Sequence, residues 1–117
     1  MNLSGKSRGL ISHVAIRSAT PTTNPTLTLT VPANTYFEGT IGLYGIAVAA
    51  TVPAMAIDDG TGLVFAMTTE LPPQAAGNPI VSGSRRVLLG PGTYNFNTTS
   101  LFFSAGQLYA TGALFKE

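Results

Sequence analysis

The sequence predicts an all-β fold: a single-domain, two-sheet sandwich of the jelly-roll type with an extended N-terminal arm. Short apolar runs alternate along the chain with turns rich in glycine, proline and asparagine, which is typical of an all-β domain. No window carries a capped apolar stripe with helical spacing. The 117 residues suffice for one domain, which we divide into a flexible arm at 1–8 and a sandwich at 9–117. An immunoglobulin-type sandwich is an alternative, but its cysteine and tryptophan core is absent from the sequence.

Eight or nine short strands are expected in chain order. They lie at 9–17, 26–31, 36–49, 62–69, 79–82, 85–90, 93–97, 100–104 and 107–115. The four residues after Pro53 are expected to form one more short strand or the entry to a turn. Asp58–Gly62 is expected to be a hairpin turn rather than a calcium loop, because Asp-Gly favours turns and the ligand series of an EF-hand is missing. Gly90-Pro91-Gly92 fits a type II turn.

Alternating side chains indicate which faces of the strands are buried. In 26–31, leucine and valine alternate with threonine, so that one face of this strand should be buried and the other wet. Two later strands are apolar on both faces. The first carries Phe37, Ile41, Leu43 and Ala47 on one side and Tyr36, Tyr44, Ile46 and Val48 on the other, and the last carries Leu108, Ala110 and Leu114 opposite Tyr109, Ala113 and Phe115.

A sandwich buries one face of each strand, so the second apolar face needs a cover of its own. Either the strand ends curl into loops, or the outward residues form an interface between subunits. We favour the interface, which would include Tyr36, Tyr44, Ile46, Val48, Tyr109 and Phe115. Its expected form is a homo-oligomer, a dimer or a trimer.

Charge is scarce: 9% of the residues are Asp, Glu, Lys or Arg, and the net charge is +1, whereas about 25% is ordinary for a soluble domain. This composition gives no broad attraction to nucleic acid or to a membrane surface. We expect neither as a partner. There is no apolar segment long enough for a membrane span and no apolar run resembling a signal peptide.

The sequence carries no pattern that names a reaction, and we expect a non-enzyme without cofactor or metal. His13 is the single histidine, and no nucleophile elbow accompanies it. Asp58 and Asp59 are adjacent and would face opposite sides of a strand. Arg85 and Arg86 are expected to open a strand at a solvated edge. A longer loop at 70–79 is expected to connect two strands over the surface.

The first eight residues carry Lys6 and Arg8, no acid and one glycine. They are expected to form an extended arm. It is either a disordered end or a segment that orders against a partner surface, with Lys6 and Arg8 as ionic anchors.

Two segments resemble a known family of proteins. "TLTLTVPANTYFEGTIGLYG", with its core at 27–45, and "RRVLLGPGTYNFNTTSLFFSAGQLYATGALFKE" at 85–117 are similar in style to the jelly-roll decoration, or cement, proteins of icosahedral bacteriophage heads. The second segment more weakly resembles trimeric jelly rolls of the tumour-necrosis-factor and C1q type. The resemblance to cement proteins implies a non-enzymatic protein that binds the major capsid protein on the outside of the virion and oligomerises. It would be made in the host cytoplasm.

Two functional hypotheses therefore stand, with an enzyme as the least favoured third. The first is a decoration protein that stabilises a phage shell, with Lys6 and Arg8 contacting the capsid. The alternative is a phage tail or fibre module that binds a glycan on the host surface, where Tyr36, Tyr44 or Tyr109 would stack on sugar rings.

Overall fold

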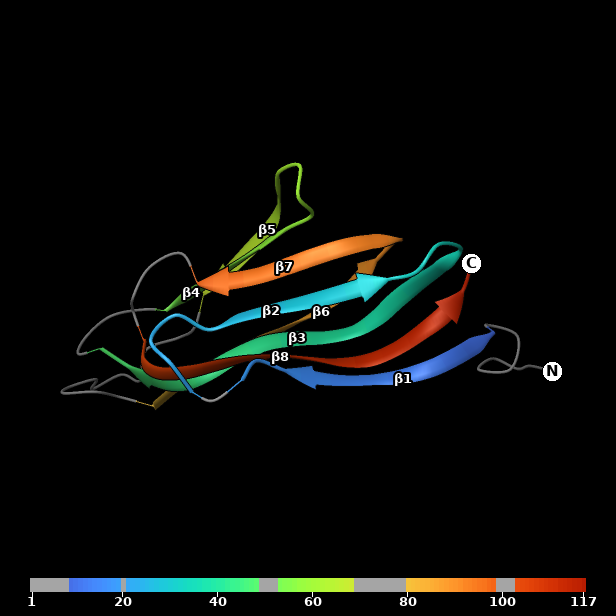
Figure 1. Cartoon of the computed structure of the whole chain (residues 1–117). Coiled ribbons are helices and arrows are strands. Elements are labelled where there is room, and N and C mark those ends of the chain that lie inside the picture. The colour runs from blue at the N-terminus through green and yellow to red at the C-terminus, as the bar shows by residue number, and fades with distance from the viewer. Residues whose placement is uncertain (1–8, 20, 49–52, 69–79, 99–102) are drawn as a thin grey trace.

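The computed structural model describes residues 9–19, 21–48, 53–68, 80–98 and 103–117, which form eight strands and no helix. The strands are β1 (Leu10–Arg17), β2 (Thr26–Val31), β3 (Thr35–Ala47), β4 (Ala54–Asp58), β5 (Leu63–Thr68), β6 (Ile80–Leu89), β7 (Gly92–Thr98) and β8 (Phe103–Lys116). They make two four-stranded antiparallel sheets, seen one above the other in Figure 1. The prediction of an all-β, two-sheet sandwich is confirmed.

The order of the strands is that of a jelly roll. One sheet runs β1-β8-β3-β6 and the other β2-β7-β4-β5. The first strand therefore pairs with the last, the second with the seventh, the third with the sixth and the fourth with the fifth, as in a long hairpin rolled up on itself. Figure 1 shows β1 in blue beside β8 in red, although these two strands are nearly a whole chain apart in sequence.

Two pairs of predicted strands are in fact single strands. Ser82–Ser84 does not form a turn but continues β6, and Ala105–Gly106 continues β8. The reason is β3, which has 13 residues and pairs along nearly all its length with both neighbours. Its ladder extends β6 and β8 through short polar residues and glycines. The residues after Pro53 form β4, so the expected short strand is confirmed and the alternative, the entry to a turn, is not.

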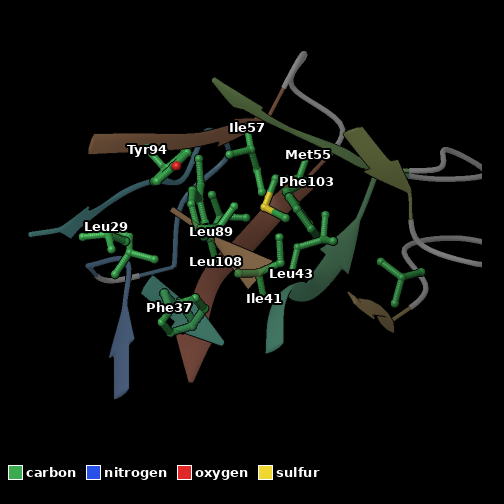
Figure 2. Close-up of a cluster of buried hydrophobic side chains, with 14 of the residues drawn as sticks. Leu29, Phe37, Ile41, Leu43, Met55, Ile57, Leu89, Tyr94, Phe103 and Leu108 are labelled. Atoms are coloured by element: carbon green, nitrogen blue, oxygen red, sulfur yellow. The ribbon is translucent and has the colours of Figure 1, made fainter. Parts of the chain in front are cut away.

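The inner faces of the strands form the core that alternation predicts (Figure 2). Its members include Leu29, Phe37, Ile41, Leu43, Met55, Ile57, Leu89, Phe96, Phe103 and Leu108, each at most 4% exposed. Leu27 and Leu114 pack against this cluster while partly exposed. The threonines of β2 point away from it and are exposed, so the predicted split of β2 into a buried and a wet face is confirmed.

The connection between β2 and β3 carries the chain from one sheet to the other. Asn34 has φ of +62°, a conformation that asparagine tolerates better than most residues. The Thr35 amide donates to the Pro32 carbonyl at 3.3 Å, and the Thr35 hydroxyl donates to the same oxygen at 2.7 Å. This closes a turn with the positive φ at its third position, the type II pattern.

The predicted turn at Asp58–Gly62 is present between β4 and β5. The Asp59 carboxylate accepts hydrogen bonds from the Thr61 amide at 2.9 Å, the Thr61 hydroxyl at 2.6 Å and the Gly62 amide at 3.2 Å. These donors, the Thr61 hydroxyl first, hold the pKa of Asp59 below its ordinary value. The carboxylate thus serves the turn itself.

The corner between β6 and β7 differs in one detail from the prediction. Gly92 has φ of +151°, whereas the third position of a type II turn needs about +80°. Gly92 is instead the first residue of β7, and the Tyr94 hydroxyl donates to the Gly90 carbonyl at 2.9 Å. The corner is therefore closed by a side chain as well as by Pro91. Burial, and secondarily the charge of Asp59, raise the pKa of this tyrosine.

Candidate binding face

The side of the β1-β8-β3-β6 sheet that points away from the core is the candidate site, and we call it the outer face. Its side chains alternate with the buried ones along each strand. From the register, rows of neighbours cross it, such as His13–Ala113–Glu38–Leu88 and Thr111–Thr40–Arg86. The outer face is thus built by four strands from both ends of the chain.

Two aromatic pairs lie on the outer face. Tyr36 stacks on Phe115 with ring centroids 5.4 Å apart and planes at 25°. Tyr44 and Tyr109 are 5.9 Å apart with planes at 51°. Both pairs link β3 to β8, because cross-strand neighbours on one face are close enough for aromatic rings to touch.

The second aromatic pair is held in place by its surroundings. The Tyr44 hydroxyl donates to Gln107 Oε1 at 2.7 Å, and Gln107 Nε2 donates to the Ala19 carbonyl at 2.7 Å. Tyr109 lies over Gly42, where any Cβ would collide with its ring and hydroxyl. The pair is therefore fixed before any partner binds.

Polar residues occupy the middle of the outer face. Arg86 Nη2 lies 3.5 Å from Glu38 Oε2, and an exposed pair of this kind contributes little to stability. His13, Glu38, Thr40, Arg86 and Thr111 line a hollow of about 370 Å³, with Gly39, Gly112 and Ala113 among its other lining residues. Gly39 and Gly112 face each other so closely that a Cβ on either would come within 2.7 Å of the other's Cα. Neither position could therefore take a larger residue unless the two strands moved apart.

Four hollows lie one after another along the outer face, and each shares a lining residue with the next. Glu38 belongs both to the polar hollow and to one of about 540 Å³ beside Tyr36 and Leu88. Thr111 joins the polar hollow to one of about 380 Å³ beside Tyr44 and Tyr109. Arg17 joins this third hollow to one of about 490 Å³ beside Gln107. Together they follow the direction of the strands from one end of the sheet to the other.

Large apolar side chains are exposed near both ends of the outer face. Ile46 and Ile80 are direct cross-strand neighbours, 39% and 78% exposed. Leu88 is 68% exposed beside Glu38, and Leu10 and Ile11 are about half exposed on β1. These side chains add exposed apolar surface near both ends of the outer face.

Five of the six residues predicted to form the interface lie on the outer face: Tyr36, Tyr44, Ile46, Tyr109 and Phe115. Val48 follows the end of β3 and is 40% exposed. The polar middle separates the two aromatic pairs, so the six do not form one continuous apolar patch. Lys6 and Arg8 of the predicted arm, and the whole predicted loop at 70–79, lie outside the described residues.

Ile80 and Leu88 were missed at the sequence level because the strand that carries both was divided at Ser82–Ser84. Arg85 and Arg86 accordingly lie in the middle of β6 and not at the start of a strand. His13 is exposed on β1 and lines the polar hollow. In the described part of the chain, no three acidic, histidine or cysteine residues gather as a metal would require. Nor does any described helix have the length and apolarity to cross a membrane.

No protein-family model and no curated protein matches the sequence. Solved structures that resemble the fold at low identity include the following two. The coat protein of Tobacco streak virus matches all of this chain and 90% of its own, with 12% identity and a TM-score of 0.45. A cycloisomaltooligosaccharide glucanotransferase from Paenibacillus sp., in complex with cycloisomaltoheptaose, matches 90% of this chain with 11% identity and a TM-score of 0.41. The chain spans 17% of that enzyme's length. The jelly-roll assignment rests on the strand order itself.

Proposed function

We propose that this chain is a non-enzymatic structural protein that binds the outside of an icosahedral phage shell as a homo-oligomer and stabilises it. The outer face is its contact with the major capsid protein. The observation that carries the proposal is the composition of this face: three tyrosines, a phenylalanine, two arginines and exposed isoleucine and leucine on one side of one sheet. Protein interfaces are enriched in tyrosine, phenylalanine and arginine.

The opposite sheet offers a contrast that supports this choice of surface. The outward side of β2 and β7 carries Thr26, Thr28, Thr30, Asn95 and Asn97. Asn95 and Asn97 direct their amides to the carboxylate of Asp58 at 3.4 and 3.5 Å, at the limit of hydrogen bonding. The polar side chains of β2 and β7 contrast with the aromatic side chains of the outer face, although the neighbouring β5 exposes Val64. This contrast supports the outer face as the contact surface.

The shell would gain stability by mass action. A protein that binds the assembled shell and not its dissociated subunits stabilises the shell as occupancy rises. Repetition of the contact over a symmetric shell, by an oligomer that engages several capsid subunits, adds avidity to modest individual contacts.

The test uses heads of the phage that encodes the chain, assembled with its gene deleted. Purified protein is added back, and binding is measured by co-sedimentation. Tyr44→Lys places a charge on the outer face and should weaken binding at least tenfold. Its matched control is Thr30→Lys, which places the same charge on the opposite sheet, where Thr30 is exposed, and should bind as the wild type does. Equal binding by both variants would contradict the assignment of the outer face, and no binding by the wild type would overturn the function.

The arm is assigned to the same contact on its sequence alone. Deletion of residues 1–8 should weaken attachment and leave the melting temperature of the isolated protein unchanged. Replacing Lys6 and Arg8 by alanine should reduce the salt dependence of binding, because fewer ionic contacts are then screened.

A second candidate function is the binding of an oligosaccharide along the outer face. The hollows that follow one another past Glu38, Thr111 and Arg17 favour it, as do the fixed rings of Tyr44 and Tyr109, since sugar rings pack on aromatic side chains beside polar groups. A panel of linear host glycans titrated by calorimetry distinguishes the two functions. Saturable binding that Tyr109→Ala abolishes, without attachment to shells, would establish the second.

A further inference from the structure

β6 is an edge strand of its sheet. Among the described strands it pairs with β3 alone. Such an edge can pair with a strand of another molecule. β6 has ten residues, enough for a long ladder.

The two ends of this strand carry the most exposed large apolar side chains in the described part of the chain. Ile80 is 78% exposed and Leu88 is 68% exposed. Both are an even number of residues from Arg86 and Ser84, so all four point to the outer face. Ser84 lies midway between Ile80 and Leu88, four residues from each.

We propose that β6 pairs antiparallel with β6 of a second copy of this chain, about a two-fold axis at Ser84. Ile80 of each copy then lies opposite Leu88 of the other copy, so this contact occurs twice in the dimer. Ser82 lies opposite Arg86, and Gly83 opposite Arg85. The most exposed apolar residues of the strand cover each other, and each arginine meets a small neutral residue.

Neighbouring registers lack this match. A shift of the axis to Arg85 or Arg86 puts like charges directly opposite each other, which destabilises a sheet. A shift to Gly83 puts Arg86 opposite Ile80 and Arg85 opposite Val81. An axis that falls between two residues is excluded, because it would place residues of opposite faces opposite one another, whereas the two-fold axis requires residues of the same face to pair. The register centred on Ser84 is therefore the one that the side chains of β6 favour.

The other edge of this sheet is less suited to such pairing. The register of β1 on β8 is broken between Leu10 and Ser12, and an irregularity of this kind disrupts an edge. Leu10 and Ile11 put the exposed apolar residues of β1 at one end only. An antiparallel pair of β1 strands could not cover them at both ends as β6 does with Ile80 and Leu88.

This pairing deepens the proposed function, on which its biological role rests, by giving the homo-oligomer its contact and making it a dimer. The two sheets would join into one sheet of eight strands, and the two outer faces would lie side by side. Self-association would then leave Tyr36, Tyr44, Tyr109 and Phe115 uncovered. They would be available to the shell.

Cross-linking in solution tests the register without any shell. The chain has no cysteine, so one introduced thiol is unique. In Ser84→Cys the two thiols face each other across the axis, at the Cα separation of 4.5 to 5.5 Å that antiparallel neighbours have and that a disulfide requires. Ser82→Cys is the matched control on the same strand and face, because its Cα atoms would be about 14 Å apart. Oxidation with diamide should give a covalent dimer of Ser84→Cys in at least tenfold excess over Ser82→Cys.

A second variant tests the pairing without a cross-link. Leu88→Lys should shift the dimer toward monomer in sedimentation equilibrium and raise the dimer dissociation constant at least tenfold. It should leave the fold intact because Leu88 is exposed. Equal cross-linking of the two cysteine variants, or a monomeric wild type, would overturn the pairing. If the pairing is overturned in this way but the wild-type protein still binds shells, the proposed function stands. A Ser84→Cys dimer that fails to bind shells would instead sustain the pairing and overturn the function.

Discussion

Tyr109 lies directly over Gly42 on the outer face of the β1-β8-β3-β6 sheet, and a side chain at Gly42 would occupy the space of its ring and hydroxyl. The Gly83 carbonyl lies 2.7 Å from the same Cβ position. Gly42 is therefore enclosed by a strand on each side. This contact sets the position of the Tyr44–Tyr109 pair on which both candidate functions depend.

Gly42→Ala should lower the free energy of unfolding by about 1–3 kcal/mol, because an added methyl group in a closed space forces neighbours to move. It should also displace Tyr109 and weaken binding at the outer face. Urea denaturation measures the first effect. The matched control is Gly90→Ala, where no atom lies within 4 Å of the Cβ position, and a change within about 0.5 kcal/mol is expected. Similar losses in both variants would contradict the role of Gly42.

Phe96 tests the core that joins the sheets. It is fully buried on β7, and Phe96→Ala should lower the free energy of unfolding by about 3–5 kcal/mol, because the cavity adds to the loss of buried surface. Thr30→Ala on the neighbouring β2 is exposed and should stay within about 0.5 kcal/mol of the wild type. A loss below 1 kcal/mol for Phe96→Ala would be at odds with one shared core.

Asp59 should make the turn between β4 and β5 sensitive to acid. Its pKa in the folded protein lies below the ordinary 3.8, so its contribution to stability is fully present above that value and is lost as the pH falls through the folded pKa. Asp59→Ala should lower the urea midpoint at pH 7, and the difference from the wild type should shrink at pH 2.5. An equal difference at both pH values would show that the charge of Asp59 has no part in it.

Much of the fold could be predicted from alternation and turn residues. The period of two in β2 and the inward set Phe37, Ile41 and Leu43 placed the core correctly, because side chains of a strand must alternate between faces. The extents of β6 and β8 could not be predicted. Ser82–Ser84 and Ala105–Gly106 resemble turns locally, and only their long-range pairing with β3 makes them strands.

The candidate site was predictable in its aromatic members but not in its layout. Tyr36, Tyr44, Tyr109 and Phe115 were recognisable as the second apolar face of two strands. The polar hollow brings His13 and Arg86 together from strands at opposite edges of the sheet. Such proximity depends on strand order, which no local pattern encodes.

The central claim is that this chain stabilises a shell, and calorimetry of gene-deleted phage heads tests it most directly. Heads are titrated with the purified protein, and the temperature of shell disassembly is followed. We predict that this temperature rises with added protein and saturates when the sites are full, and that Tyr44→Lys raises it only at much higher concentration. A disassembly temperature that stays constant up to a large excess of wild-type protein would contradict the account.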